Sequence, residues 1–448
     1  MSTFSIVVES FKGEPTIEEY NLTVAKIAVI GTGYVGLSSG ACFAHLGHEV
    51  VCVDVVQSKI DNLNVGIIPI VETGLDDLVK KGVEAGRLTF TIDVVLAASD
   101  ADVIFLCVPT PEGEDGSADL SYIQQAARTL STIVRSGAVI VNKSTVPVGS
   151  TQVVERELKR PDVSVVSNPE FLREGSAIQD FLHPDRVVVG SDNQEAALKV
   201  AALYESVGAP VVVTDPASAE TIKYAANAFL ATKISYINAV AAICEGVGAD
   251  IRDVVLGLGY DHRIGHEFLR PGPGWGGSCF PKDTKAMVKI AEDAGYDFGL
   301  LKGVITVNEQ QYGRIVEKIR MAVGGNLKGK TIAAWGLTFK ALTDDLRDSP
   351  AVEIIQRLLA DGAQINVFDP TVNAAPHSLA AINVASSAID ACRKADALVV
   401  LTEWDEFKWV DPVEVGSLLS TKQVIDARNH LDRSAWKKAG FEYQGIGR

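Results

Sequence analysis

Short apolar runs alternate with segments of helical period along the first half of the chain. Segments such as YIQQAARTLSTIV at 122–134 carry apolar residues at helical spacing. Between them stand strand-like runs, which are KIAVIG at 26–31, HEVVCVD at 48–54, ADVIFLCVP at 101–109, GAVIVNKST at 137–145 and VSVVSNPEF at 163–171. This alternation predicts βαβ units on a parallel sheet.

The pattern changes between about residues 218 and 318. ETIKYAANAFLATKISYINAVAAICEGVG is long, alanine-rich and periodic, which predicts a long helix or a helix pair. A second βαβ series then follows with TIAAWG, INVFDP, ADALVVLTE and QVIDARN. We therefore expect an α/β protein with two Rossmann-like, doubly wound domains joined by a long-helix central domain. The expected parts are an extension of unassigned structure at 1–24, a nucleotide-binding domain at 25–217, a helical domain at 218–325 and a second Rossmann-like domain at 326–448.

The net charge and the cysteine content of the chain limit the kinds of ligand and partner that it is expected to bind. The formal charge of −16 disfavours nucleic acid binding by bulk electrostatics, so anions have to be held by local cations and backbone amides. We find no continuous apolar run of about 18 to 20 residues and no signal-peptide pattern, so we expect a cytoplasmic protein without a membrane partner. The six cysteines are scattered, with no CxxC pair; we expect them to be reduced and expect no metal site.

GTGYVG at 31–36 matches the GxGxxG fingerprint of dinucleotide-binding folds. The pattern is weak alone, but here it follows a predicted strand and opens a predicted helix. Gly31 permits the turn, Gly33 lets the backbone approach a pyrophosphate, and Gly36 permits close helix packing. Asp54 ends the next strand, where a carboxylate accepts ribose hydroxyls and repels a 2′-phosphate. NAD is therefore the expected cofactor, with Lys59 as a weaker candidate for a phosphate contact.

A single cysteine stands in a glycine-rich loop, WGGSCFPKD at 275–283. A thiol is useful when an aldehyde has to be oxidised further, because sulfur adds to the carbonyl and the adduct loses hydride to give a thioester. Cys279 has room beside glycines, and Lys282 and Asp283 supply charge and a base. Cys42 and Cys244, in apolar helical runs, are expected to be core residues.

At this point the chain resembles a known family, the UDP-glucose 6-dehydrogenases of the UDP-glucose/GDP-mannose dehydrogenase group. The resemblance covers about residue 25 to the C-terminus. It rests on GTGYVGL, STVPVGST, SNPEFLREGSAIQDFLHPDRVVVG, IKYAANAFLATKISYIN, RIGHEFLRPGPGWGGSCFPKD, GLTFKALTDDLRDSPA and VIDARN, in this order. It implies a four-electron oxidation in one active site, from UDP-glucose and two NAD to UDP-glucuronate.

The resemblance also implies roles for individual residues. Cys279 is the nucleophile, Asp283 a base acting with water, and Lys223 the donor to the sugar 6-oxygen. Asn227 lies one helical turn from Lys223 and would bind substrate or the oxyanion, Thr145 would position water, and Glu170 would activate water for thioester hydrolysis. Without the resemblance, Lys223 reads equally as a solvated helix residue, Asn227 as an interhelical hydrogen bond, and Glu170 and Glu174 as a capping pair.

The remaining implied contacts are to the two nucleotides. For the cofactor, the residues are Gly31, Gly33, Tyr34, Val35, Gly36, Asp54, Lys59, Thr110, Thr145, Glu174 and Arg347. For the substrate, they are Phe171, Leu172, Arg173, Lys223, Asn227, Arg263, Phe268, Leu269, Gly276, Lys340 and Arg428. Arg263 matches an arginine that reaches the neighbouring subunit's substrate, which implies a homodimer or a higher homo-oligomer.

One loop departs from the family pattern. Val71 and Thr73 stand where a tyrosine and a proline are usual, while Glu72 and Gly74 remain. We expect a more flexible loop on the cofactor side. Three alternatives stay open. The first is the same chemistry on UDP-N-acetylmannosamine, UDP-N-acetylglucosamine or GDP-mannose. The second is a two-electron 3-hydroxyacid dehydrogenase, which would lack the nucleophilic cysteine, and the third is a nucleotide-sugar-binding protein without catalysis.

Overall fold

The computed structural model describes residues 6–8, 24–113 and 118–448. They divide into two compact units between Ala225 and Ala226, and each unit is described by itself. This division falls inside a long helix, so the three-part boundaries expected at 217/218 and 325/326 stay a prediction.

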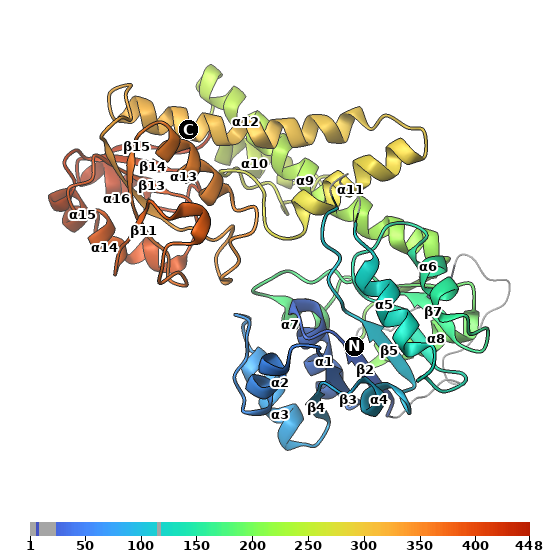
Figure 1. Ribbon diagram of the computed structural model, residues 1–448. Helices are drawn as coiled ribbons and strands as arrows, with labels where there is room; N and C mark the ends of the chain where they lie inside the picture. The colour runs from blue at the N-terminus through green and yellow to red at the C-terminus, as the bar shows by residue number, and fades with distance from the viewer. Residues whose placement is uncertain (1–5, 9–23, 114–117) are drawn as a thin grey trace. The chain divides into compact units, whose positions relative to one another are not determined.

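The first unit is built on one largely parallel sheet (Figure 1). In sheet order the described strands are β1 (Ile6–Val8), β9 (Val211–Thr214), β8 (Val187–Gly190), β7 (Ser164–Ser167), β6 (Val139–Asn142), β5 (Val103–Leu106), β2 (Lys26–Ile30), β3 (Glu49–Val53) and β4 (Leu88–Thr91). Neighbours pair in parallel, except β7 and β8, which meet antiparallel. Because the chain order reverses between β2 and β5, the sheet has a switch point where doubly wound folds bind ligands.

Helices connect these strands. They are α1 (Tyr34–His45), α2 (Gln57–Asn64), α3 (Leu75–Glu84), α4 (Val94–Ala98), α5 (Ser121–Leu130), α6 (Ser150–Leu158), α7 (Ala177–Leu182) and α8 (Gln194–Ala202). The strands predicted in this half are confirmed as β2, β3, β5, β6 and β7, and the periodic segment at 122–134 contains α5.

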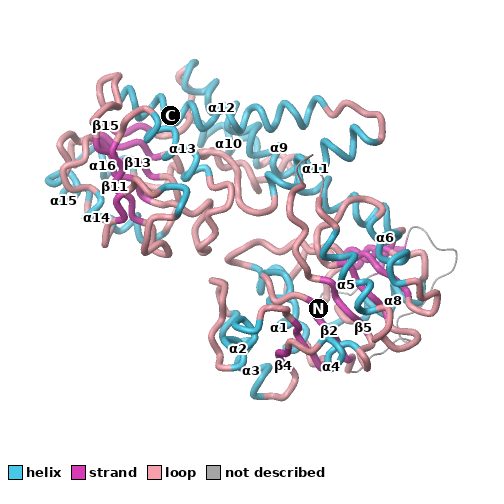
Figure 2. The backbone as a smooth tube through the Cα atoms, in the orientation of Figure 1, coloured by secondary structure: helices cyan, strands magenta, loops and turns pink. Residues whose placement is uncertain are grey.

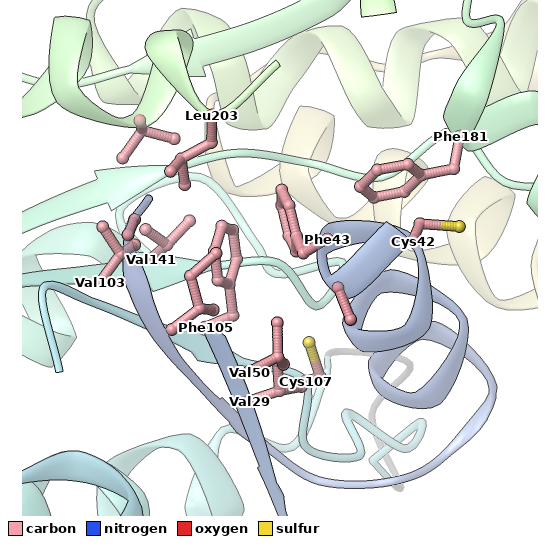
Figure 3. Packing of buried hydrophobic residues seen from close by; sticks show 14 of the residues in the cluster. Val29, Cys42, Phe43, Val50, Val103, Phe105, Cys107, Val141, Phe181 and Leu203 are labelled. Atoms are coloured by element: carbon pink, nitrogen blue, oxygen red, sulfur yellow. The ribbon is translucent and has the colours of Figure 1, made fainter. Parts of the chain in front are cut away.

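Both faces of this sheet are buried. Along β5, Val103 and Phe105 pack in one apolar cluster while Ile104 and Leu106 pack in the other, as the two-residue period of a strand requires. Figure 3 shows the first cluster, in which Phe43 of α1 lies against Phe105 with ring centroids 4.9 Å apart. This packing holds α1, and therefore its N-terminus, firmly on the sheet.

The N-terminal extension contributes a strand that the sequence pattern did not predict. Residues Ile6–Val8 pair in parallel with Val211–Val213 of β9 and so occupy the edge of the sheet. The rest of the segment expected at 1–24 lies outside the described residues, apart from Val24.

The second unit combines long helices with a smaller parallel sheet (Figure 2). The strand order is β12 (Asn383–Val384), β11 (Gln364–Phe368), β10 (Thr331–Trp335), β13 (Ala397–Val400), β14 (Gln423–Asp426) and β15 (Glu442–Gln444). The helices are α10 (Ile251–Gly259), α11 (Phe280–Asp293), α12 (Gly299–Ala322), α13 (Pro350–Ala360), α14 (Ala388–Ala391), α15 (Pro412–Leu418) and α16 (Arg433–Lys438). The predicted α/β class with parallel-dominated sheets is confirmed.

The predicted long helix is a single helix, α9 (Pro216–Val247), 32 residues in length. It begins in the first unit and continues into the second. Within the described ranges it is the one helix that is long and apolar enough to cross a membrane by length and composition, although the sequence holds no continuous apolar run of that length. Part of its apolar surface is core, since Ile237, Ala241 and Cys244 are buried in the second unit.

Candidate active site

The fingerprint turn between β2 and α1 has the geometry that its glycines predict. Gly31 has φ +103°, and a Cβ there would lie 2.5 Å from the Cys107 carbonyl oxygen. A Cβ on Gly36 would lie 1.9 Å from the Gly31 oxygen, so both positions exclude larger residues. Gly33, by contrast, has open space beside it, and it caps α1 without a side-chain hydrogen bond. The amides at the start of α1 are therefore approachable by an anion.

Asp54 lies at the carboxyl end of β3, next to this turn. Its carboxylate accepts hydrogen bonds from the Thr32 amide at 3.0 Å, the Thr32 hydroxyl at 2.8 Å and the Val56 amide at 3.0 Å. Burial opposes the charged form, but these hydrogen bonds outweigh it and lower the pKa of Asp54. Lys59 Nζ lies 3.5 Å from Asp54, so its nearest described partner is this carboxylate. A charged acceptor with a spare lone pair on Oδ1 suits two ribose hydroxyls.

Two other predicted cofactor residues meet beyond the carboxyl ends of the neighbouring strands β5 and β6. The Thr110 hydroxyl donates to the Thr145 carbonyl oxygen at 2.9 Å. Tyr34, the first residue of α1, places its hydroxyl against Glu72 and 3.3 Å from the Arg173 carbonyl oxygen. Glu174 is half-buried on the same turn as Arg173. The open Gly33 and the charged Asp54 suit the diphosphate and the adenine ribose of NAD. The cofactor contacts of Tyr34, Thr110, Thr145 and Glu174 stay predictions.

Glu170 and Lys223 form a buried ion pair in the first unit. Lys223 Nζ lies 2.9 Å from Glu170 Oε1, and the side chains are 4% and 5% exposed. The second carboxylate oxygen accepts the Leu172 amide at 2.6 Å. Lys223 is therefore not the solvated helix residue of the alternative reading, since a buried ammonium has to be held by a partner.

Cations also flank the ring of Phe171, next to this pair. The guanidinium of Arg186 lies 3.6 Å from the ring centroid, and Lys223 Nζ lies 5.4 Å from it. Sequence reasoning missed Arg186, although it stands in the quoted HPDRVVVG block. Arg173, in contrast, carries an exposed side chain that pairs with Asp180 at 2.6 Å.

The second unit holds the predicted nucleophile and base. Cys279 is the N-cap of α11, and it is half-exposed whereas the other five cysteines are buried. Asp283 follows one turn later and is completely buried. Its Oδ2 accepts Asn227 Nδ2 at 2.6 Å, and its Oδ1 accepts Lys282 Nζ at 2.7 Å. Asn227 thus makes a hydrogen bond between α9 and α11, as the alternative interpretation expected, one turn after Lys223 on α9.

Hydrogen bonds and close packing fix the loop that leads to Cys279. The Gly272 amide donates to Asn238 at 2.8 Å, and Gln311 donates to the Gly272 oxygen at 2.8 Å. A Cβ on Gly276 would lie 2.0 Å from the Asp348 oxygen, so only glycine fits. Phe268 has φ +62°, a strained value for a residue with a side chain, and Leu269 is buried.

The predicted cations of the second unit differ in their partners. Arg428 is held by the Leu401 oxygen at 2.8 Å, the Phe339 oxygen at 2.7 Å and Glu403 at 2.9 Å. Arg347 is largely exposed and pairs with Asp345 at 2.7 Å, and Arg263 is 78% exposed and pairs with Asp261 at 2.6 Å. Lys340 Nζ lies 5.4 Å from the ring centroid of Phe339. The roles of these cations stay predictions.

Comparison with known proteins identifies the family. Family models for the NAD binding domain, the central domain and the UDP binding domain of the UDP-glucose/GDP-mannose dehydrogenase family match residues 25–208, 217–310 and 333–433. UDP-glucose 6-dehydrogenase TuaD of Bacillus subtilis is 48% identical over 94% of this chain and 93% of its own length. UDP-glucose 6-dehydrogenase of Rhizobium meliloti is 46% identical over 94% and 99%.

Solved structures agree with these relatives. A UDP-glucose dehydrogenase from Pyrobaculum islandicum matches with a TM-score of 0.86 and 36% identity, over 95% of this chain and 98% of its own. A UDP-D-ManNAc dehydrogenase from Pyrococcus horikoshii matches with 0.85 and 29%, over 94% and 99%. The expected cofactor, NAD, is confirmed by the first family model. The chain belongs to the UDP-glucose/GDP-mannose dehydrogenase family.

Proposed function

We propose that this protein oxidises the C6 alcohol of UDP-glucose to the carboxylate of UDP-glucuronate in two successive two-electron steps. The observation that carries the proposal is the position of Cys279. It is the one cysteine of six that is not buried, it caps a helix in a glycine-rich loop, and it lies one turn from the buried Asp283. The sugar is chosen from the relatives, because TuaD and its Rhizobium meliloti counterpart act on UDP-glucose by name.

Each oxidation has to remove a hydride, which bound NAD⁺ accepts. In the first, Lys223 donates to the C6 oxygen and Asp283 takes the alcohol proton through water, leaving an aldehyde. The Cys279 thiol then adds to the aldehyde, with its sulfur bonding to C6 and its proton passing to the C6 oxygen, which Lys223 and Asn227 stabilise in the thiohemiacetal. Asp283 takes that hydroxyl proton through water as the second hydride leaves. The second hydride loss leaves a thioester on Cys279, and water positioned by Thr145 releases the acid and the thiol.

The contacts give Glu170 a second task in this scheme. The resemblance makes it the carboxylate that activates water, but its Oε1 lies 2.9 Å from Lys223 Nζ. We propose that it also holds the ammonium in place. Because Oε2 accepts the Leu172 amide, the carboxylate cannot rotate away from Lys223 without losing that hydrogen bond.

Cys279→Ser separates the two oxidations. The variant is expected to bind UDP-glucose and NAD and to make the aldehyde or its adduct, detected by mass spectrometry, without releasing UDP-glucuronate. Cys244→Ala, which changes a buried cysteine of α9, is the control and should retain acid formation. Release of UDP-glucuronate by Cys279→Ser at a rate near wild type would contradict the nucleophile assignment.

We also propose a homodimer formed through α9. Phe229, Tyr236, Ile243 and Val247 are 64%, 55%, 62% and 72% exposed, and their spacing of seven, seven and four residues places them on one helix face. An apolar stripe of this kind is typical of a helix that packs on another copy. The cytoplasmic location is part of the same proposal and agrees with six unpaired cysteines.

Sedimentation tests the dimer. Tyr236→Glu with Ile243→Glu should convert a dimer to a monomer, while Tyr296→Glu, an equally exposed tyrosine outside α9, should not. Mixed Arg263→Ala and Cys279→Ala chains should regain some activity if Arg263 serves the neighbouring site. A monomeric wild type would refute the dimer, and no regained activity in confirmed mixed dimers would refute the shared site.

A further inference from the structure

Glu72 is a buried carboxylate that none of the catalytic steps uses. It lies on the loop between α2 and α3, and the residue is only 7% exposed. In the described part of the chain it forms no ion pair with lysine or arginine; instead its donors are one hydroxyl and two backbone amides. These are the Tyr34 hydroxyl, the Gly175 amide at 2.7 Å and the Ala177 amide at 2.9 Å.

The donors come from two segments that the proposed function assigns to different ligands. Tyr34 is the first residue of α1, directly after Gly33 of the phosphate-binding turn. Gly175 and Ala177 follow the Glu170–Glu174 turn, and Ala177 begins α7, which lies beside α1 in Figure 1. One carboxylate therefore ties the cofactor turn to the turn that carries the predicted substrate amides.

Tyr34 strengthens this link. Its hydroxyl accepts the Gly175 amide at 3.0 Å besides donating to Glu72. Burial, and then the hydrogen bond to Glu72, raise the pKa of Tyr34 well above its usual value, so the hydroxyl stays a donor at neutral pH. Val71 and Thr73 on either side are exposed, so Glu72 is the buried residue that anchors this loop.

We infer that Glu72 is a positioning residue that fixes the NAD-binding turn against the substrate-binding turn, so that the two sites form together. Three donors converge on its two oxygens, and a neutral amide of the same shape has only one oxygen to offer. In Glu72→Gln the new NH₂ group would face a backbone N–H, which leaves a buried donor unsatisfied. The substrate half of this inference rests on the proposed function, whereas the cofactor half does not.

The test compares E72Q and Y34F with Y443F in the full-length protein. Tyr443 donates to the buried Asp426 at 2.7 Å in the second unit, so Y443F removes the same kind of hydrogen bond away from the cofactor turn. Calorimetry gives the dissociation constant of NADH, steady-state kinetics give kcat and both KM values, and thermal melting gives stability. Y34F, which keeps the ring and the backbone, serves as the test if E72Q fails to fold.

Loss of positioning should raise the NADH dissociation constant and the KM values for NAD and UDP-glucose by about tenfold in E72Q, with kcat within about threefold of wild type. Y34F should show a smaller change in the same direction, and Y443F should lower the melting temperature without changing NADH affinity. The inference is overturned if E72Q and Y34F only melt earlier, as Y443F does, or if only one of the two ligands loses affinity. If wild type binds NADH but does not oxidise UDP-glucose, the proposed function fails, while the NADH measurement still decides the role of Glu72 in cofactor binding.

Discussion

Removing the ammonium of Lys223 would leave the buried Glu170 without its ion-pair partner. The carboxylate is 5% exposed and would keep the Leu172 amide and the charge of the nearby Lys143. Breaking a buried ion pair by deleting one member lowers the free energy of unfolding by about 3–5 kcal/mol. Because Glu170 keeps a hydrogen bond to the Leu172 amide, we expect Lys223→Met to cost about 3 kcal/mol. The methionine keeps most of the apolar stem, so little of this cost is lost packing.

A double-mutant cycle isolates the pair. Lys223→Met and Glu170→Gln should each destabilise the protein, and the double variant should recover about 2 kcal/mol relative to the sum of the two, because neither group is then buried without a partner. Arg128→Met is the control, since the Arg128–Glu157 pair is half-exposed and should contribute less than about 1 kcal/mol.

The choice of probe matters in this chain. All five tryptophans lie between residues 275 and 436, in the second unit, whereas the pair lies in the first. Urea unfolding should therefore be followed by hydrogen exchange of peptides from β7 and the start of α9, because two units need not unfold together. Strictly additive costs in the cycle, or a cost for Lys223→Met no larger than that of Arg128→Met, would show that the buried pair does not stabilise the protein.

Three further predictions follow from individual side chains. Asp54→Ser should raise kcat/KM for NADP at least tenfold and lower it for NAD, because the charge that repels a 2′-phosphate is gone; unchanged cofactor preference in steady-state assays would contradict the role of Asp54. Lys143 is fully buried, and burial lowers its pKa to about 8 from 10.5. Between pH 8 and 10.5 the unfolded chain binds more protons than the folded one, so the free energy of unfolding of wild type should rise with pH. Measured relative to Lys143→Met, the rise should be on the order of 3 kcal/mol. Free energies of unfolding that change with pH in the same way in both proteins would refute this. Lys223→Met should lower kcat/KM at least 100-fold, and a kcat/KM near wild type would contradict its role as an oxyanion donor.

Local patterns in the sequence predicted much of the fold. The alternation of apolar runs and periodic segments located the main strands, because buried parallel strands read as continuous apolar runs. β4, β8, β9, β12 and β15 were not predicted, although β8 and β9 are apolar runs of the same length as β5. β1 was missed as well, and its pairing with β9 spans about 200 residues of sequence. Pairings of that separation leave no mark on local composition.

The site was predictable where the chemistry needs a particular residue type in a particular turn. Gly31, Gly36 and Gly276 had to be glycines, and Cys279 stood out because its loop was open. The partners were not predictable, since Asn227 with Asp283 and Glu170 with Lys223 join residues more than 50 positions apart. Glu72 was recognised only as a residue that the loop shares with the family pattern. The neighbouring sequence does not show that three hydrogen-bond donors would converge on its carboxylate.

The four-electron oxidation of UDP-glucose is tested most directly by the amount of NADH formed per molecule of limiting UDP-glucose, measured beside UDP-N-acetylmannosamine, UDP-N-acetylglucosamine and GDP-mannose. Two NADH per UDP-glucose are expected, with UDP-glucuronate as the product and little reaction of the other three. One NADH per UDP-glucose would mean that oxidation stops at the aldehyde and would contradict the role given to Cys279. Two NADH from another sugar nucleotide, with none from UDP-glucose, would contradict the substrate.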